Sequence, residues 1–83
     1  MKESYKNEND GFSYDIKKQL GVISKDKKGI FQTEVNLISF RGAEPKVDIR
    51  KWNRETDQML KGITLTKEEA LKLADILYKE YKE

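Results

Sequence analysis

The sequence predicts an α+β fold in which four antiparallel strands are followed by one C-terminal helix. Three observations lead to this prediction. Between residues 12 and 65, apolar and polar residues alternate over four separate segments, which is the period of half-buried strands. Short polar segments separate these strands, and two of the three contain Gly or Pro, as turns do. After residue 65 the apolar residues recur at the spacing of a helix instead.

The first strand follows a polar segment. Residues 1–11 show no apolar periodicity, and we expect them to form a flexible tail ahead of a single domain over residues 12–83. From Phe12 onward, the apolar residues of the strand fall on even positions: Tyr14, Ile16, Leu20 and Val22. Gly21 interrupts the pattern near its middle, so a β-bulge is expected there.

The second strand is predicted over residues 30–41. A polar turn at residues 26–29 precedes it, and Gly29 can adopt the positive φ that such turns require. Alternation directs one set of its side chains toward a core: Phe31, Val35 and Leu37. Ile38 and Phe40 then share the opposite face, which is otherwise polar.

The third and fourth strands are predicted from Lys46 to about Asn53 and over residues 59–65. A polar loop separates them. In the third strand Val47 and Ile49 point toward the core, and the other side chains point to the opposite face: Asp48, Arg50 and Trp52. The one Trp of the chain therefore shares a polar face with an Arg.

The C-terminal helix is predicted to begin after Thr66, which can form a capping box with Glu69. One apolar stripe is predicted to cover a face of the sheet: Ala70, Leu73, Ala74, Leu77, Tyr78 and Tyr81. Leu71 and Ile76 lie beside this stripe. The helix is therefore either sunk deeply into the core or in contact with a second subunit, through Leu71, Ile76 and Tyr78. Because one helix shields one face of a sheet, the other face is expected to be open for binding.

The composition restricts the possible functions. The sequence contains no Cys and no His, so this chain of 83 residues has neither disulfides nor the commonest metal ligands, and we expect no metal or cofactor. Oligomerisation is the remaining route to extra stability. No segment has the apolar core of a signal peptide or the length of a membrane span, so we expect a cytoplasmic protein.

The charges are unevenly distributed along the chain. Residues 14–66 hold eleven basic and seven acidic side chains, whereas the whole chain has a net charge of +2. This central excess of positive charge suggests an anionic partner. The alternative explanation is a solvated surface of mixed charge that binds no partner. Without His or Cys, no spacing of residues supports catalysis, and we expect a binding protein and not an enzyme.

Aromatic and basic side chains are predicted to share the open face of the sheet, which is the combination that single-stranded nucleic acid requires. The candidates are Phe40, Arg50 and Trp52, with Lys17 nearby and Arg41 and Lys61 at the ends of the face. Each also has a purely structural explanation. Phe40 could cover the edge of the core, Arg50 could pair with Glu34, and Trp52 could pack under a loop.

Three short motifs together resemble one known family. They are Phe40-Arg41-Gly42 at a strand end, Asp48-Ile49-Arg50 followed by an aromatic residue, and Lys61-Gly62-Ile63-Thr64-Leu65 leading into the helix. Their order and spacing resemble the single-stranded-DNA-binding domain of the transcriptional coactivator positive cofactor 4, and in particular its bacterial relatives.

The resemblance covers residues 12–83 and implies a homodimer with curved sheets, in which the helices meet across the two-fold axis. It implies that Phe40 stacks on bases and that Arg41, Arg50 and Lys61 contact phosphates. The expected function is binding of single-stranded DNA with little sequence preference, in transcription regulation or in the handling of exposed single strands. The transcription machinery is a further candidate partner. The alternatives are a dimeric protein-interaction module with Trp52 in its interface, and an RNA-binding domain.

Overall fold

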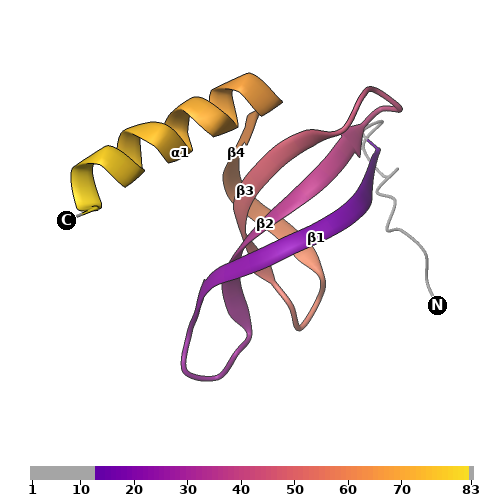
Figure 1. Ribbon diagram of the computed structural model, residues 1–83. Helices are drawn as coiled ribbons and strands as arrows, with labels where there is room; N and C mark the ends of the chain where they lie inside the picture. Colours follow the sequence, from indigo (N-terminus) through magenta and orange to yellow (C-terminus); the bar gives the residue numbers. More distant parts are fainter. Residues whose placement is uncertain (1–12, 83) are drawn as a thin grey trace.

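The structure, a computed structural model, describes residues 13–82 (Figure 1). Its elements are the strands β1 (Tyr14–Lys25), β2 (Phe31–Phe40), β3 (Lys46–Asn53) and β4 (Gln58–Leu65) and the helix α1 (Lys67–Tyr81). The strands form one antiparallel sheet in the order β1-β2-β3-β4. The predicted α+β class is therefore confirmed. The predicted tail at residues 1–11 lies outside the described residues.

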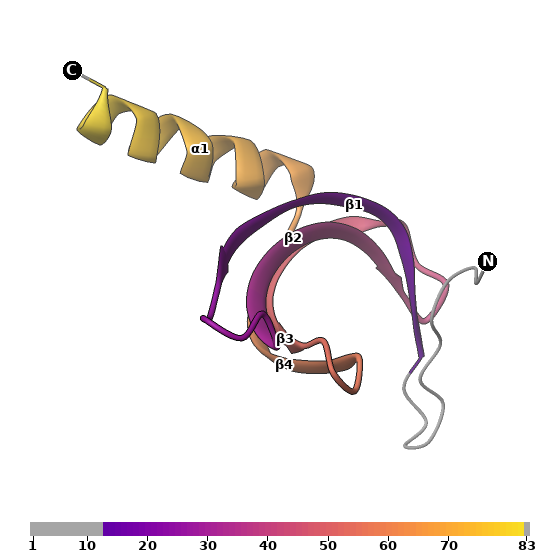
Figure 2. The ribbon, with the colours of Figure 1, turned by 90° about the horizontal axis from the view of Figure 1, so that it is seen from below.

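The sheet is strongly curved. Figure 2 shows its strands following an arc around a common interior, with α1 outside the arc. The pairing of β1 with β2 shifts register three times, between Ile16 and Lys18, between Gln19 and Gly21, and between Val22 and Ser24. Each extra residue on one strand bends that strand and increases its twist. The bulge predicted at Gly21 is confirmed, and the two flanking bulges, which have no glycine, were not predicted.

The hydrophobic core lies on the concave face of the sheet. Tyr14, Ile38 and Trp52 are buried there, and other apolar side chains pack against them: Ile16, Phe40 and Met59. The rings of Tyr14 and Trp52 meet edge to face, with their centroids 6.2 Å apart. Because the sheet is curved, side chains from several strands meet on its concave face. They shield one another from solvent without a second layer of helices or strands.

The predicted side of the core is right for β1, where Tyr14 and Ile16 lie in or against the core on the concave face. It is wrong for β2 and β3 in the single chain, where the set of side chains expected in the core occupies the convex face. On that face Val35, Leu37, Val47 and Ile49 are only half-buried, and Phe31 is exposed. The middle of the face expected to be open is filled by the chain's own side chains.

Helix α1 begins with the predicted capping box. The Glu69 amide donates to Thr66 Oγ1 at 3.1 Å, and the Thr66 amide donates to Glu69 Oε1 at 2.8 Å. The prediction that the apolar stripe covers the sheet is wrong, because α1 projects away from the sheet (Figure 1) and none of its described residues is buried. Only Ala70, in the first turn, is half-buried. Among residues 13–82, no helix is long and apolar enough to cross a membrane.

Candidate nucleic-acid interface

The turn after β2 fixes one end of the concave face. Arg41 and Gly42 both have positive φ, 55° and 76°, and the Ala43 amide donates to the Phe40 carbonyl at 3.0 Å. These φ values fit a type I′ turn, whose twist matches that of the strands it joins. The Arg41 amide also donates to the Ser13 carbonyl at 2.9 Å, which ties the turn to the start of β1. The Arg41 side chain is thus exposed at the tip of a well-anchored turn.

A cavity of about 300 Å³ opens beside this turn. Its lining residues are Phe40, Ala43, Glu44, Lys46, Arg50 and Thr64. The ring of Phe40 is half-buried and contacts the ring of Tyr14, with centroids 6.5 Å apart. The structure therefore brings two of the predicted contacts, Phe40 and Arg50, into one cavity. It adds Lys46, which the sequence reasoning missed because it treated this residue only as the start of a strand.

Arg50 is held in place by acceptors on β3 and β4. Its Nε and a terminal nitrogen each donate to the Asp48 carboxylate at 2.7 Å, and its other terminal nitrogen donates to the Leu60 carbonyl at 3.0 Å. Asp48 is fully buried and also accepts from Thr64 Oγ1 at 2.9 Å. The predicted alternative, a pair between Arg50 and Glu34, is not formed. Because Asp48 balances its charge, Arg50 contributes shape to the cavity more than net positive potential.

Trp52 is completely buried, with no exposed surface. The ring of Tyr14 packs against it, and the Arg54 guanidinium carbon lies 4.2 Å from its ring centroid. This is a cation–π contact. Trp52 therefore packs structurally, which is one of the alternatives open from the sequence, and it presents no ring face to solvent.

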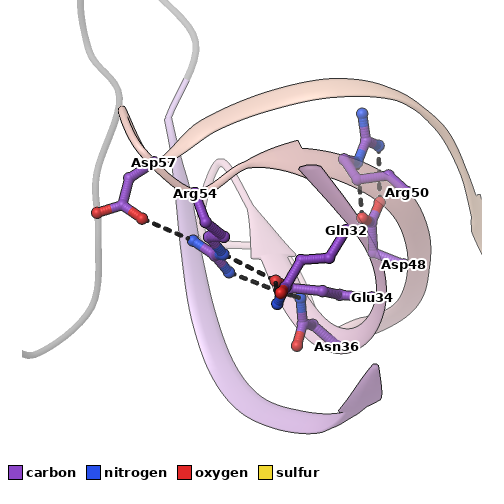
Figure 3. Close-up of polar contacts among 7 residues, drawn as sticks. All are labelled: Gln32, Glu34, Asn36, Asp48, Arg50, Arg54 and Asp57. Carbon is purple, nitrogen blue, oxygen red and sulfur yellow. Dashed lines mark hydrogen bonds and ion pairs between the residues drawn. The ribbon is translucent and has the colours of Figure 1, made fainter. Parts of the chain in front are cut away.

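Arg54 and Glu34 form a second network on the concave face (Figure 3). Arg54 Nε and a terminal nitrogen donate to the two Glu34 oxygens at 2.7 and 2.6 Å, and the other terminal nitrogen donates to Asp57 Oδ1 at 3.0 Å. Gln32 and Asn36 also donate to Glu34, at 2.7 and 3.2 Å. The sequence reasoning missed Arg54 because it lies in a polar loop, where alternation assigns no face.

The ionisation of this pair follows from its contacts. Burial of Glu34 disfavours the carboxylate and would raise its pKa. The hydrogen bonds from Arg54, Gln32 and Asn36, together with the charge of Arg54, outweigh burial, so the pKa of Glu34 is lowered from its ordinary value. The hydrogen bond to Glu34 in turn raises the pKa of Arg54. Both groups are charged at neutral pH.

The remaining predicted contacts lie outside the Phe40 cavity. Lys17, at a bulge of β1, is exposed, and its Nζ lies 2.8 Å from Asp15 Oδ2. It lines a separate cavity of about 330 Å³ on the β1 side of the same turn, together with Ser39 and Gly42. Lys61 is exposed on the edge strand β4. The three residues predicted for a dimer interface are all exposed in the single chain: Leu71, Ile76 and Tyr78.

Comparison with known proteins agrees with this fold and these motifs. The family model described as Transcriptional Coactivator p15 (PC4) matches residues 32–76, from the start of β2 into the last turns of α1. A protein of Treponema pallidum (strain Nichols), described as an uncharacterized protein, is 38% identical over 69 residues, which are 83% of this chain and 80% of that protein. The match confirms the resemblance found in the sequence motifs. The chain belongs to the Transcriptional Coactivator p15 (PC4) family.

Proposed function

We propose that this protein binds single-stranded DNA with little sequence preference and catalyses no reaction. Membership of a family that in general binds single-stranded DNA supports this proposal. The observation that carries it is the cavity in which the ring of Phe40 lies beside Lys46 and Arg50, next to the exposed Arg41. An aromatic ring offers a stacking surface to any base, and cations beside it attract the phosphates that flank the base.

Two of the predicted cations form ion pairs with neighbouring acids. Asp48 neutralises Arg50 and Asp15 pairs with Lys17, so these two side chains add little net charge. We assign the phosphate contacts mainly to Arg41, Lys46 and Lys61, which are exposed. Arg50 holds the floor of the cavity in shape. Arg50 therefore stays in the proposed interface, but as a residue that shapes the cavity and not as a main phosphate contact.

We also propose that the working unit is a homodimer. The single chain leaves the stripe of α1 exposed and the apolar convex face only half-buried, and its small core gives limited stability. Pairing two chains through these surfaces would bury both. A dimer would leave the two concave faces, and hence the two Phe40 cavities, free for nucleic acid.

For the cellular role, we propose transcription regulation or the handling of exposed single strands, in the cytoplasm. The family assignment supports the first part, and the absence of Cys is in keeping with a reducing compartment. Single-stranded RNA offers the same bases and phosphates, so an RNA oligonucleotide belongs in every binding panel. A protein-interaction module built on Trp52 is disfavoured, because that side chain is completely buried.

The proposal is tested by titrating the protein into a fluorescently labelled oligo-dT strand and recording anisotropy. Phe40→Ala should weaken binding roughly tenfold to a hundredfold, the value of about one lost stacking contact. Ile23→Ala is the control, because Ile23 is an exposed apolar residue of β1 that lines none of the cavities described above. Unchanged affinity for Phe40→Ala, with the fold intact by circular dichroism, would contradict the stacking role of Phe40.

A further inference from the structure

Arg54 lies on the wall of a third cavity, of about 460 Å³. The lining residues come from β1, β2 and the loop after β3: Gln19, Leu20, Gly21, Val22, Gln32, Glu34, Asn36 and Arg54. This cavity is distinct from the one beside Phe40, because the two share no lining residue. Its volume is ample for one nucleobase.

The contacts of Arg54 leave one of its surfaces uncovered. Hydrogen bonds to Glu34 and Asp57 occupy its three nitrogens in the plane of the guanidinium, and Trp52 covers one face of that plane. The side chain remains 17% exposed. Arg54 lines the cavity, so this exposed surface is available to a ligand there.

The local charge favours a neutral ligand over a phosphate. Arg54 carries one positive charge, while its partners Glu34 and Asp57 carry two negative charges, so the group as a whole is anionic. The hydrogen bonds to Glu34 and Asp57 use three of the five N–H groups of the guanidinium, and a phosphate that approached the other two would be repelled by the net negative charge of the group. A flat, fixed guanidinium plane is instead suited to stacking on a base.

The other walls of the cavity complete a site for a base. Leu20 and Val22 of β1 are about half exposed and offer aliphatic surface. Asn36 Oδ1 is buried without a hydrogen-bond partner, although the Asn36 side chain lines this cavity. An unsatisfied buried acceptor is costly, and the amino or imino group of a base would supply its missing donor.

We propose that Arg54, backed by Trp52 and locked by Glu34, is a stacking platform for a second nucleobase of the bound strand. This inference rests on the proposed binding of single-stranded nucleic acid. Glu34 and Phe40 are six residues apart on β2, which places the two base sites roughly 20 Å apart along the strand direction. A single strand that follows β2 across the concave face would meet both sites.

The direct test uses the unmodified protein and the Arg54 Nε–H signal in its nitrogen–proton NMR spectrum. Oligo-dT should shift this signal upfield, because a stacked base places its ring current over the guanidinium. A fully abasic strand of equal length should leave the signal in place. Binding of oligo-dT that moves other signals but not this one would overturn the inference while leaving the proposed function intact. Absence of any shift at all would overturn both.

Two substitutions that exchange Arg and Lys provide an independent test. Arg54→Lys keeps the charge but removes the plane, and should weaken oligo-dT binding about tenfold without changing the slope of affinity against salt. Lys27→Arg is the control, because it exchanges the same two cations at an exposed position in the turn between β1 and β2, and it should leave affinity within about twofold. Equal losses for the two variants would contradict a platform role for Arg54. If Arg54→Lys fails to fold, the NMR measurement on the unmodified protein still tests whether a base stacks on Arg54.

Discussion

Glu34 illustrates how one residue on the concave face serves the stability of the fold. Its carboxylate is 3% exposed and accepts hydrogen bonds from Arg54, Gln32 and Asn36, which connect β2 to the loop after β3. A buried charge is tolerated only when it is paired in this way. The pair also fixes the guanidinium over Trp52. Stability and the shape of the proposed second base site therefore depend on the same contacts.

Replacement of this carboxylate by an amide should have an effect that depends on pH. Glu34→Gln should lower the free energy of unfolding at pH 7 by about 2–3 kcal/mol, because Arg54 loses its charged partner. The folded-state pKa of Glu34 is lowered from 4.5, so its contribution is fully present above pH 4.5 and is lost as the pH falls through the lower folded-state value. Urea denaturation of both proteins at pH 7 and at successively lower pH measures the difference. An equal difference at every pH would show that the charge is not its source.

The two aromatic residues that the sequence places on one face should behave differently when truncated. Trp52→Ala should lower the free energy of unfolding by about 3–5 kcal/mol, because it empties a fully buried site and removes the surface under Arg54. Phe40→Ala should cost clearly less stability, because Phe40 is only half-buried. Urea denaturation, monitored by circular dichroism, measures the free energy of unfolding of both variants. A smaller loss for Trp52→Ala than for Phe40→Ala would contradict the placement of the core.

At the scale of the elements, alternation correctly divided the residues of β2 and β3 between two faces, but it identified the buried face only in β1, at Tyr14 and Ile16. That choice depends on curvature, which β1 acquires from three bulges, and only the bulge at Gly21 has a glycine to indicate it. The turn at Arg41 and Gly42 could be expected from its glycine. The positive φ of Arg41 could not, because residues other than glycine rarely adopt it. Helix α1 was recognisable from its cap and its spacing, whereas its direction is set by tertiary contacts that no local pattern encodes.

Gly62 allows the close pairing of β3 and β4 to be tested. A Cβ at this position would collide with the Cβ of Arg50 and would lie 2.6 Å from the Ile49 carbonyl oxygen. Gly62→Ala should therefore push the strands apart, lower the free energy of unfolding by about 1–3 kcal/mol and displace Arg50 from the Phe40 cavity. Gly21→Ala is the control, because a Cβ there would meet nothing within 4 Å. Thermal unfolding of both variants measures the effect. Equal midpoint temperatures for Gly62→Ala and Gly21→Ala would contradict the close approach of β3 and β4 at Gly62.

At the scale of the whole molecule, the exposed apolar surface is the main feature that a single chain leaves unexplained. Static light scattering should give the mass of two chains for the unmodified protein at micromolar concentration. Leu71→Glu should reduce it toward one chain, because a charge would be buried in the proposed interface. Lys72→Gln, which changes the net charge by the same amount at a neighbouring exposed position, should remain dimeric. A mass of one chain for the unmodified protein would eliminate the dimer.

The central claim, preference for single strands, is tested most directly by competition. Unlabelled oligo-dT and a duplex of equal length would each be used to displace labelled oligo-dT, at two salt concentrations. Bases in a duplex are already stacked and cannot reach Phe40, so the duplex should compete at least about tenfold less well. Affinity for the single strand should fall steeply as salt rises, since counterions are released on binding. A duplex that competes as well as or better than the single strand would contradict the account.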